Sequence, residues 1–187
     1  MRVIAGNCRG MMLKAPQGEK TRPTADRVKE SLFNILSNQK NFDECNVLDI
    51  CAGTGSLGIE SLSRGALSCS FIEQDMKVSE VLRQNLMHTR LESNSELLTM
   101  EACKALRLLS ARGRKFDLVF LDPPYESGIY ESTAELLCTL RLLADNSLFI
   151  AECSARIHLS ECLGSLVKTD RRVYGDTALE FFSMEVA

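Results

Sequence analysis

Asp122, Pro123, Pro124 and Tyr125 form the segment of this chain with the clearest chemical capability. They follow the apolar run 116–121, which predicts a buried strand. A proline lacks an N–H and has a fixed φ, so the strand must end in a rigid tip with outward-pointing carbonyls. The Asp122 carboxylate and the Pro123 carbonyl could then accept both N–H bonds of an exocyclic amine, while the Tyr125 ring stacks on the attached heterocycle.

This tetrapeptide resembles the (Asp/Asn)-Pro-Pro-(Tyr/Phe) motif of S-adenosylmethionine-dependent amino-methyltransferases. A Pro-Pro turn with an incidental tyrosine is the alternative interpretation of these four residues alone. The rest of the chain must decide between the two.

The segment 49–58 (DICAGTGSLG) has the composition of a loop that holds a nucleotide-like ligand against its backbone. Its spacing Gly53-x-Gly55-x-x-Gly58 also fits the dinucleotide fingerprint, so a nicotinamide dehydrogenase is an alternative. Asp49, however, places negative charge where a dinucleotide would bring its phosphates. A carboxylate there favours a ligand with a positive amino-acid end, such as S-adenosylmethionine.

Residues after two further predicted strands complete this cofactor site. Glu73 is expected to bind the ribose hydroxyls, and the Glu101–Ala102 pair is expected at the adenine edge. Loops that follow parallel strands meet at one edge of the sheet, so these side chains should converge. The predicted cofactor-binding residues are Asp49, Cys51, Ala52, Gly53, Gly55, Glu73, Gln74, Glu101 and Ala102.

Strand and helix patterns alternate from residue 46 onward, which predicts a parallel sheet covered on both faces. The last two strands predict an antiparallel hairpin. Strands are expected at 47–50, 68–72, 96–100, 116–121, 147–151, 166–173 and 178–185. Helices are expected at 57–64, 76–89, 102–111, 129–142 and, briefly, 156–163.

The first 40 residues differ from the rest in charge. They carry eight basic and three acidic side chains, a balance of +5, which leaves −8 for the remainder because the net charge is −3. Residues 3–14 predict a β-hairpin, and a helix with inward apolar positions should begin near residue 26. This asymmetry predicts a basic arm that contacts phosphate on an otherwise acidic body.

The composition indicates one globular domain in the cytoplasm. The chain has 187 residues, of which 45% are hydrophobic, enough for one core. It has neither an apolar run of about 20 residues, as a membrane span needs, nor a signal peptide's apolar core. Its eight cysteines form no Cys-x-x-Cys pair and there are two histidines, so reduced thiols and no metal site are predicted.

Five segments together resemble the bacterial 16S ribosomal RNA guanine-N2 methyltransferase family, of the small-subunit methyltransferase D type. They cover essentially the whole chain: 2–6 (RVIAG), 21–34 (TRPTADRVKESLFN), 49–58, 122–125 and 174–179 (YGDTAL). The resemblance implies a Rossmann-like class I methyltransferase fold with a seven-stranded, mostly parallel sheet and an antiparallel C-terminal hairpin. A hairpin and helix extension over 1–40 would contact RNA and pack on a methyltransferase domain over 41–187.

The resemblance also implies the reaction. S-adenosylmethionine would donate a methyl group to the N2 amine of an everted guanine in 16S ribosomal RNA, leaving S-adenosylhomocysteine. The partner would be the 30S subunit or its assembly intermediate, and the protein would be a monomer. The residues that would act on the base are Asp122, Pro123, Pro124 and Tyr125, and the expected RNA contacts are Arg2, Arg9, Arg22, Thr24, Arg27 and Lys29.

Two positions depart from the family pattern. Glu101 stands where relatives usually have aspartate, and Cys51 stands where an aromatic or other apolar residue is common. Cys51 lies in the cofactor loop, which does not suit a covalent cytosine-C5 mechanism. DNA adenine-N6 or cytosine-N4 methylation is an alternative function, because the same tetrapeptide serves there. A ribosome-assembly module without catalysis is another, although the intact acids argue against it.

Overall fold

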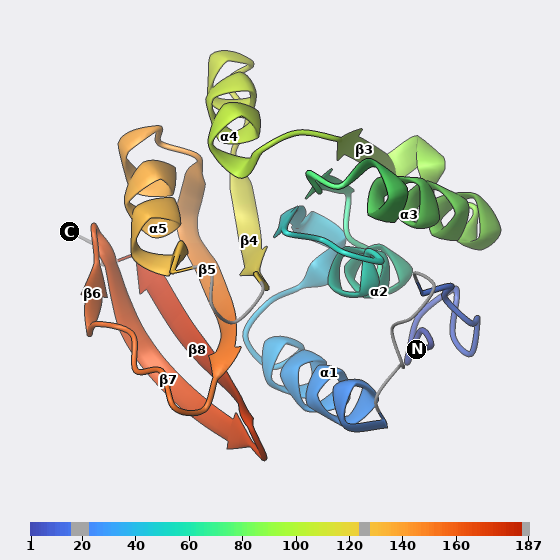
Figure 1. Ribbon diagram of the computed structural model, residues 1–187, viewed down its shortest axis with the longest axis horizontal. Helices are drawn as coiled ribbons and strands as arrows, with labels where there is room; N and C mark the ends of the chain where they lie inside the picture. The colour runs from blue at the N-terminus through green and yellow to red at the C-terminus, as the bar shows by residue number, and fades with distance from the viewer. Residues whose placement is uncertain (16–22, 124–127, 185–187) are drawn as a thin grey trace.

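An eight-stranded sheet runs through the centre of the protein and carries helices on both faces (Figure 1). The computed structural model describes residues 1–15, 23–123 and 128–184. In the order β3-β2-β1-β4-β5-β8-β7-β6, the first five strands pair in parallel and the last three pair antiparallel. The strands are β1 (Asn46–Ile50), β2 (Ser68–Ile72), β3 (Ser95–Leu98), β4 (Phe116–Leu121), β5 (Leu143–Ser154), β6 (Cys162–Leu163), β7 (Leu166–Tyr174) and β8 (Thr177–Met184).

Two hydrophobic cores separate the helices from the sheet. On one face, Leu32 and Phe33 of the first helix pack with Phe120 of β4, and on the other face Leu106 packs with Val119. Neighbours in β4 therefore serve different cores, because successive strand residues point to opposite faces. No helix in the described ranges is long and apolar enough to span a bilayer. The α-helices are α1 (Pro23–Leu36), α2 (Ser56–Ser63), α3 (Met76–Thr89), α4 (Ala102–Ala111) and α5 (Tyr130–Thr139).

The centre of the sheet is a topological switch point. From β1 the chain adds β2 and β3 on one side, and β4 and β5 follow on the other. In such sheets a crevice opens at the carboxyl ends of the strands where the order reverses, and ligands bind there. The two segments predicted to do chemistry follow β1 and β4, so the topology brings them to the same crevice.

The predicted fold class is confirmed, with a local difference near the C-terminus. The sheet has eight strands rather than seven because the two-residue strand β6 pairs with β7. The short helix predicted near 156–163 is wrong. Arg171 of β7 donates from Nη2 to the carbonyls of Ala155 and Ile157, at 2.9 and 3.0 Å. A side chain from the sheet thus binds carbonyls at the start of this segment.

The arm folds back on itself as predicted, with Val3 donating its N–H to the Met11 carbonyl at 3.0 Å and Leu13 to the Met1 carbonyl at 2.9 Å, but it forms no continuous strand ladder. Residues 1–15 form a turn-rich loop in which Arg2 and Met12 make an isolated antiparallel bridge. The N–H groups of Ile4 and Ala5 donate to the carboxylate of Glu60 in α2, at 2.7 and 3.0 Å. Because these donors are bound by α2, they are not available for a strand ladder within the arm.

Candidate active site

The loop between β1 and α2 is built over a buried carboxylate. Asp49 is 1% exposed, and its Oδ2 accepts the N–H of Gly58 at 2.9 Å. Burial raises the pKa of Asp49 to about 7; the bond from Gly58 opposes this rise and the charge of Glu73 adds to it. Asp49 therefore supports the loop from beneath, and its contact with the cofactor stays a prediction.

The three glycines of this loop have different roles. A Cβ on Gly55 would lie 2.1 Å from Leu82 Cδ1, and one on Gly58 would lie 2.2 Å from Phe71 Cε1, so both positions are needed for packing. Gly53 has φ +54°, and the nearest atom to a Cβ there would be 4.0 Å away. Gly53 is therefore the glycine whose surroundings are open to a ligand.

Glu73, directly after β2, fixes the open part of the loop. Its Oε2 accepts the N–H of Gly53 at 3.0 Å, and its Oε1 accepts the N–H of Asp75 at 2.9 Å. A carboxylate has about four acceptor sites, so two of them remain for the hydroxyls of a ribose. Asp75 in turn caps α3 through the N–H groups of Lys77 and Val78.

Cys51 has the backbone of a tight turn and an unreactive thiol. Its φ is +60° and its side chain is half-buried. Burial, followed by the charges of Glu73, Asp122 and Asp49, raises the pKa of this thiol to about 12. The thiol stays protonated at neutral pH, which argues against Cys51 as a nucleophile.

The other predicted cofactor residues lie at the same end of the parallel strands. Ala52 is buried and donates its N–H to Ile72 at 3.0 Å, which ties the loop to β2. Gln74 is exposed. Glu101 is also exposed and forms an ion pair with Lys104 at 3.5 Å, and Ala102 follows it at the start of α4.

The tip of β4 presents Asp122 to solvent. The Asp122 N–H donates to Ile50 of β1 at 3.3 Å, and Pro123 is buried. Asp122 is exposed as a whole residue, but burial of its carboxyl group raises its pKa well above the ordinary value, and the charges of Glu152 and Asp49 add to this. The predicted Pro124 and Tyr125 lie outside the described residues.

Glu152 is a nearby acid that the sequence-based site did not include. It follows Ala151 in β5, and Ala151 pairs with Leu121, the residue before Asp122. Glu152 is half-buried, and burial raises its pKa to about 7. The signal that identified Glu73, an acid at the carboxyl end of a parallel strand, is also present here and could have identified Glu152.

We expect the cofactor-free protein to lose stability as the pH rises from about 4 to about 7. The pKa values of Asp49 and Glu152 lie at about 7, above their ordinary values of 3.8 and 4.5. In this window the folded state binds protons that the unfolded state does not, so the free energy of unfolding falls with pH, by up to about 1.4 kcal/mol per pH unit per proton. Urea unfolding at several pH values measures the slope. Asp49→Asn should flatten it, and an unchanged slope in that variant would contradict the account.

Comparisons with known proteins decide the family. The family described as Conserved hypothetical protein 95 matches residues 1–183. The chain belongs to this family. Its relative in Escherichia coli strain K12, Ribosomal RNA small subunit methyltransferase D, is 35% identical over 185 residues, which cover 99% of this chain and 90% of that protein. The resemblance predicted from the sequence is thus confirmed.

Solved structures agree with this membership. The structure of yhhF from Escherichia coli is 33% identical, has a TM-score of 0.84 and covers 100% of this chain and 99% of that chain. SMU.776, solved in complex with S-adenosylhomocysteine, is 16% identical with a TM-score of 0.70, over 88% of this chain and 50% of that chain. The second likeness shows a shared fold alone.

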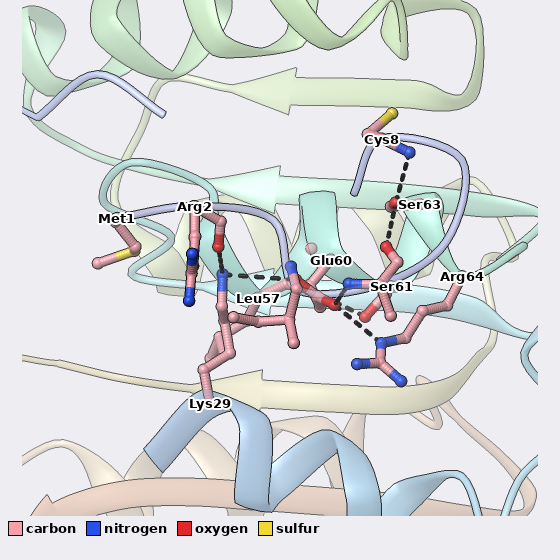
Figure 2. Close-up of polar contacts among 12 residues, drawn as sticks. Met1, Arg2, Cys8, Lys29, Leu57, Glu60, Ser61, Ser63 and Arg64 are labelled. Atoms are coloured by element: carbon pink, nitrogen blue, oxygen red, sulfur yellow. Dashed lines mark hydrogen bonds and ion pairs between the residues drawn. The ribbon is translucent and has the colours of Figure 1, made fainter. Parts of the chain in front are cut away.

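The N-terminal arm of this family member, residues 1–15, is docked on α2 around Glu60 (Figure 2). The Glu60 side chain is fully buried, accepts the N–H groups of Ile4 and Ala5, and pairs with Arg64 at 2.9 Å. Beside it, Cys8 donates its N–H to the Ser63 hydroxyl at 2.9 Å. The arm is therefore held in one position by buried polar groups on α2.

The arm also touches the loop that carries Gly53. Asn85 of α3 is fully buried, and its amide donates to the carbonyls of Lys14 and Thr54, at 3.1 and 3.0 Å. Its Oδ1 accepts the N–H of Lys14 at 2.8 Å. One side chain thus holds the end of the arm beside the candidate cofactor loop.

Lys29, a predicted RNA contact, has a structural position instead. It is 4% exposed, its Nζ donates to the carbonyl of Arg2 at 2.7 Å, and it lies 3.5 Å from the Glu60 carboxylate (Figure 2). Burial lowers the pKa of Lys29, and the charge of Glu60 offsets part of this. The prediction that Lys29 contacts RNA is therefore corrected, because its charge is enclosed between α1, α2 and the arm.

The other predicted RNA contacts divide into two groups. Arg2, Arg9 and Arg27 are exposed and are free to meet phosphate. Arg22 and the side chain of Thr24 lie outside the described residues.

We expect Gly6→Ala to detach the arm, whereas Gly10→Ala should not. Both glycines have positive φ, +79° and +84°, so both variants carry the same backbone strain. A Cβ on Gly6 would lie 1.7 Å from the Ser63 carbonyl oxygen, while one on Gly10 meets nothing within 4 Å. Gly6→Ala should therefore cost about 1–3 kcal/mol more in urea unfolding. Equal losses in the two variants would show that the docked position of the arm is wrong.

Proposed function

We propose that this protein transfers the methyl group of S-adenosylmethionine to the N2 amine of a guanine in 16S ribosomal RNA. The observation that carries the proposal is the position of Asp122, an exposed residue at a proline-bounded strand tip beside the glycine loop. The name of the Escherichia coli relative supports small-subunit ribosomal RNA as the substrate.

The cofactor would lie over the loop between β1 and α2, with its methionine part against Gly53, where a side chain is absent and space is open. Glu73 would accept hydrogen bonds from the ribose hydroxyls while it keeps its bonds to Gly53 and Asp75. Ala102 and Glu101, after β3, would border the adenine. S-adenosylmethionine supplies an electrophilic methyl group on a positive sulfonium.

The chain's own groups would hold and orient the acceptor amine. The carbonyl of Pro123 and the carboxylate of Asp122 accept the two N2 hydrogens, which favours a pyramidal amine whose lone pair points at the methyl group. Burial raises the pKa values of Asp122 and Glu152, and the charge of Glu152 raises that of Asp122 further, so the positive sulfonium would favour their ionised forms. Asp122 or water takes the proton after the new N–C bond has acidified the amine. Positioning and electrostatics would supply most of the rate.

Exposed basic residues of the arm and α1 would bind the RNA backbone. Arg2, Arg9 and Arg27 are exposed, and the end of the arm at Lys14 is held beside the cofactor loop by Asn85. DNA methylation is not favoured, since a family relative is named for ribosomal RNA.

Transfer of a tritiated methyl group tests the substrate class. Purified protein is incubated with labelled S-adenosylmethionine and 30S subunits, naked 16S RNA or DNA, with the 30S particles taken from cells that lack the protein. Label is expected in the ribosomal RNA, either in particles or free. Label in DNA alone would overturn the proposed function.

A further inference from the structure

Glu152 lies beside Asp122, at the point where the parallel pairing of β4 with β5 ends. Leu121 of β4 pairs with Ala151 of β5, so the residues that follow them are neighbours across a strand spacing of about 5 Å. Phe120 and Ile150, two residues earlier in each chain, both pack in the core beneath α1, α2 and α3. Strand alternation therefore directs Asp122 and Glu152 to this same face.

The carboxylate of Glu152 has no counter-charge among the residues that the structure describes. Its main-chain carbonyl accepts the hydroxyl of Tyr130 at 3.2 Å, which fixes the backbone and leaves the side chain unused. Its partner across the antiparallel pair is Leu179 of β8, an apolar residue. No hydrogen bond or ion pair joins the Glu152 carboxylate to any residue in 1–15, 23–123 or 128–184.

Glu180, an acid on the neighbouring strand, has a purely structural role and serves as a comparison for Glu152. Glu180 of β8 is fully buried, and it pairs with Lys168 at 3.1 Å and Arg171 at 2.9 Å. Glu152 is also partly removed from water, as its raised pKa indicates, but no cation among the described residues pairs with it. A half-buried acid that faces the acceptor crevice, with no partner in the described parts of the chain, suits a donor brought by the substrate.

We propose that Glu152 is the residue that selects guanine, by accepting the N1–H of the base whose N2 amine is held by Asp122. The inference rests on the proposed guanine-N2 reaction. Guanine presents N1–H and N2–H side by side on its Watson–Crick edge, which matches two neighbouring carboxylates. Adenine presents a lone pair at N1, which the Glu152 carboxylate repels. A site built to bind a donor discriminates strongly against an analogue that lacks it.

The test compares guanine with 2,6-diaminopurine, placed at the methylated position of the RNA. Diaminopurine keeps the N2 amine, but its N1 is an acceptor. Wild-type protein should prefer guanine by about a hundredfold or more in kcat/KM. In Glu152→Gln the carboxamide can donate to N1 of diaminopurine, so the preference should shrink at least tenfold and the rate on diaminopurine should rise. Glu131→Gln, at an exposed acid of α5, is the matched control and should keep the wild-type ratio.

A second variant distinguishes a change in base preference from a loss of folding. Glu152→Asp keeps a carboxylate and should retain the preference for guanine at a lower rate. If wild type methylates guanine N2 and Glu152→Gln keeps the wild-type ratio, the assignment of Glu152 is overturned while the proposed function stands. If wild type places no methyl group on N2 of either base, the proposed function fails, and the role of Glu152 fails with it.

Discussion

Replacing Asp122 by alanine should slow methyl transfer by about a hundredfold or more and leave the affinity for S-adenosylmethionine nearly unchanged. Asp122 is an exposed residue at the tip of β4, so it can meet the acceptor amine. Its position is set by the backbone bond to Ile50 and by Pro123, neither of which the substitution removes. A single electrostatic partner placed at the reacting group is commonly worth this much in rate.

Single-turnover transfer at saturating cofactor measures the chemical step, and calorimetry measures cofactor affinity separately. Asp122→Asn keeps one acceptor oxygen and should retain more activity than Asp122→Ala. Asp176→Ala, at an exposed acid in the turn between β7 and β8, is the control and should behave as wild type. Turnover close to wild type in Asp122→Ala would show that the tip of β4 does not take part in the reaction.

Replacing Glu73 by alanine should weaken S-adenosylmethionine binding by roughly ten- to a hundredfold or more, since a hydrogen bond to a charged group is worth about 1.5–3 kcal/mol. Glu73 would lose its bonds to the ribose, and Gly53 would lose the acceptor of its N–H. The open part of the loop would then be less ordered before the cofactor arrives.

Calorimetric titration with S-adenosylmethionine measures this loss. Glu80→Ala removes an acid of similar size from the exposed surface of α3, where it pairs with Arg83 at 3.5 Å, and should leave the affinity unchanged. Normal cofactor binding by Glu73→Ala would mean that the ribose lies elsewhere.

The positions of site residues could be predicted from the sequence where the local strand pattern determines them. Acids after β2 and β4 could be predicted at one edge because parallel strands carry their following loops there. The roles of the glycines could not be assigned in the same way. Gly55 and Gly58 are required by Leu82 and Phe71, which are distant in sequence, while Gly53 alone of the three borders open space.

Charged residues were the least predictable part of the site. Lys29 has the sequence context of an exposed helix residue, yet its ammonium group is buried beside the Glu60 carboxylate. It also donates to the carbonyl of Arg2, so its position depends on the docking of the arm on α2. The absence of a helix at 156–163 likewise depends on Arg171, which binds carbonyls of this segment from β7. Glu60 is distant in sequence from Lys29, and Arg171 is distant from the carbonyls that it binds, so no periodic pattern reveals these contacts.

Identification of the methylated nucleoside tests the central claim most directly. Ribosomal RNA labelled by the purified protein is digested to nucleosides, and the labelled product is separated and identified by mass spectrometry. The account predicts label in N2-methylguanosine, and its loss with the Asp122→Ala variant. Label in a methylated adenosine, in a cytidine or at another atom of guanine would contradict it.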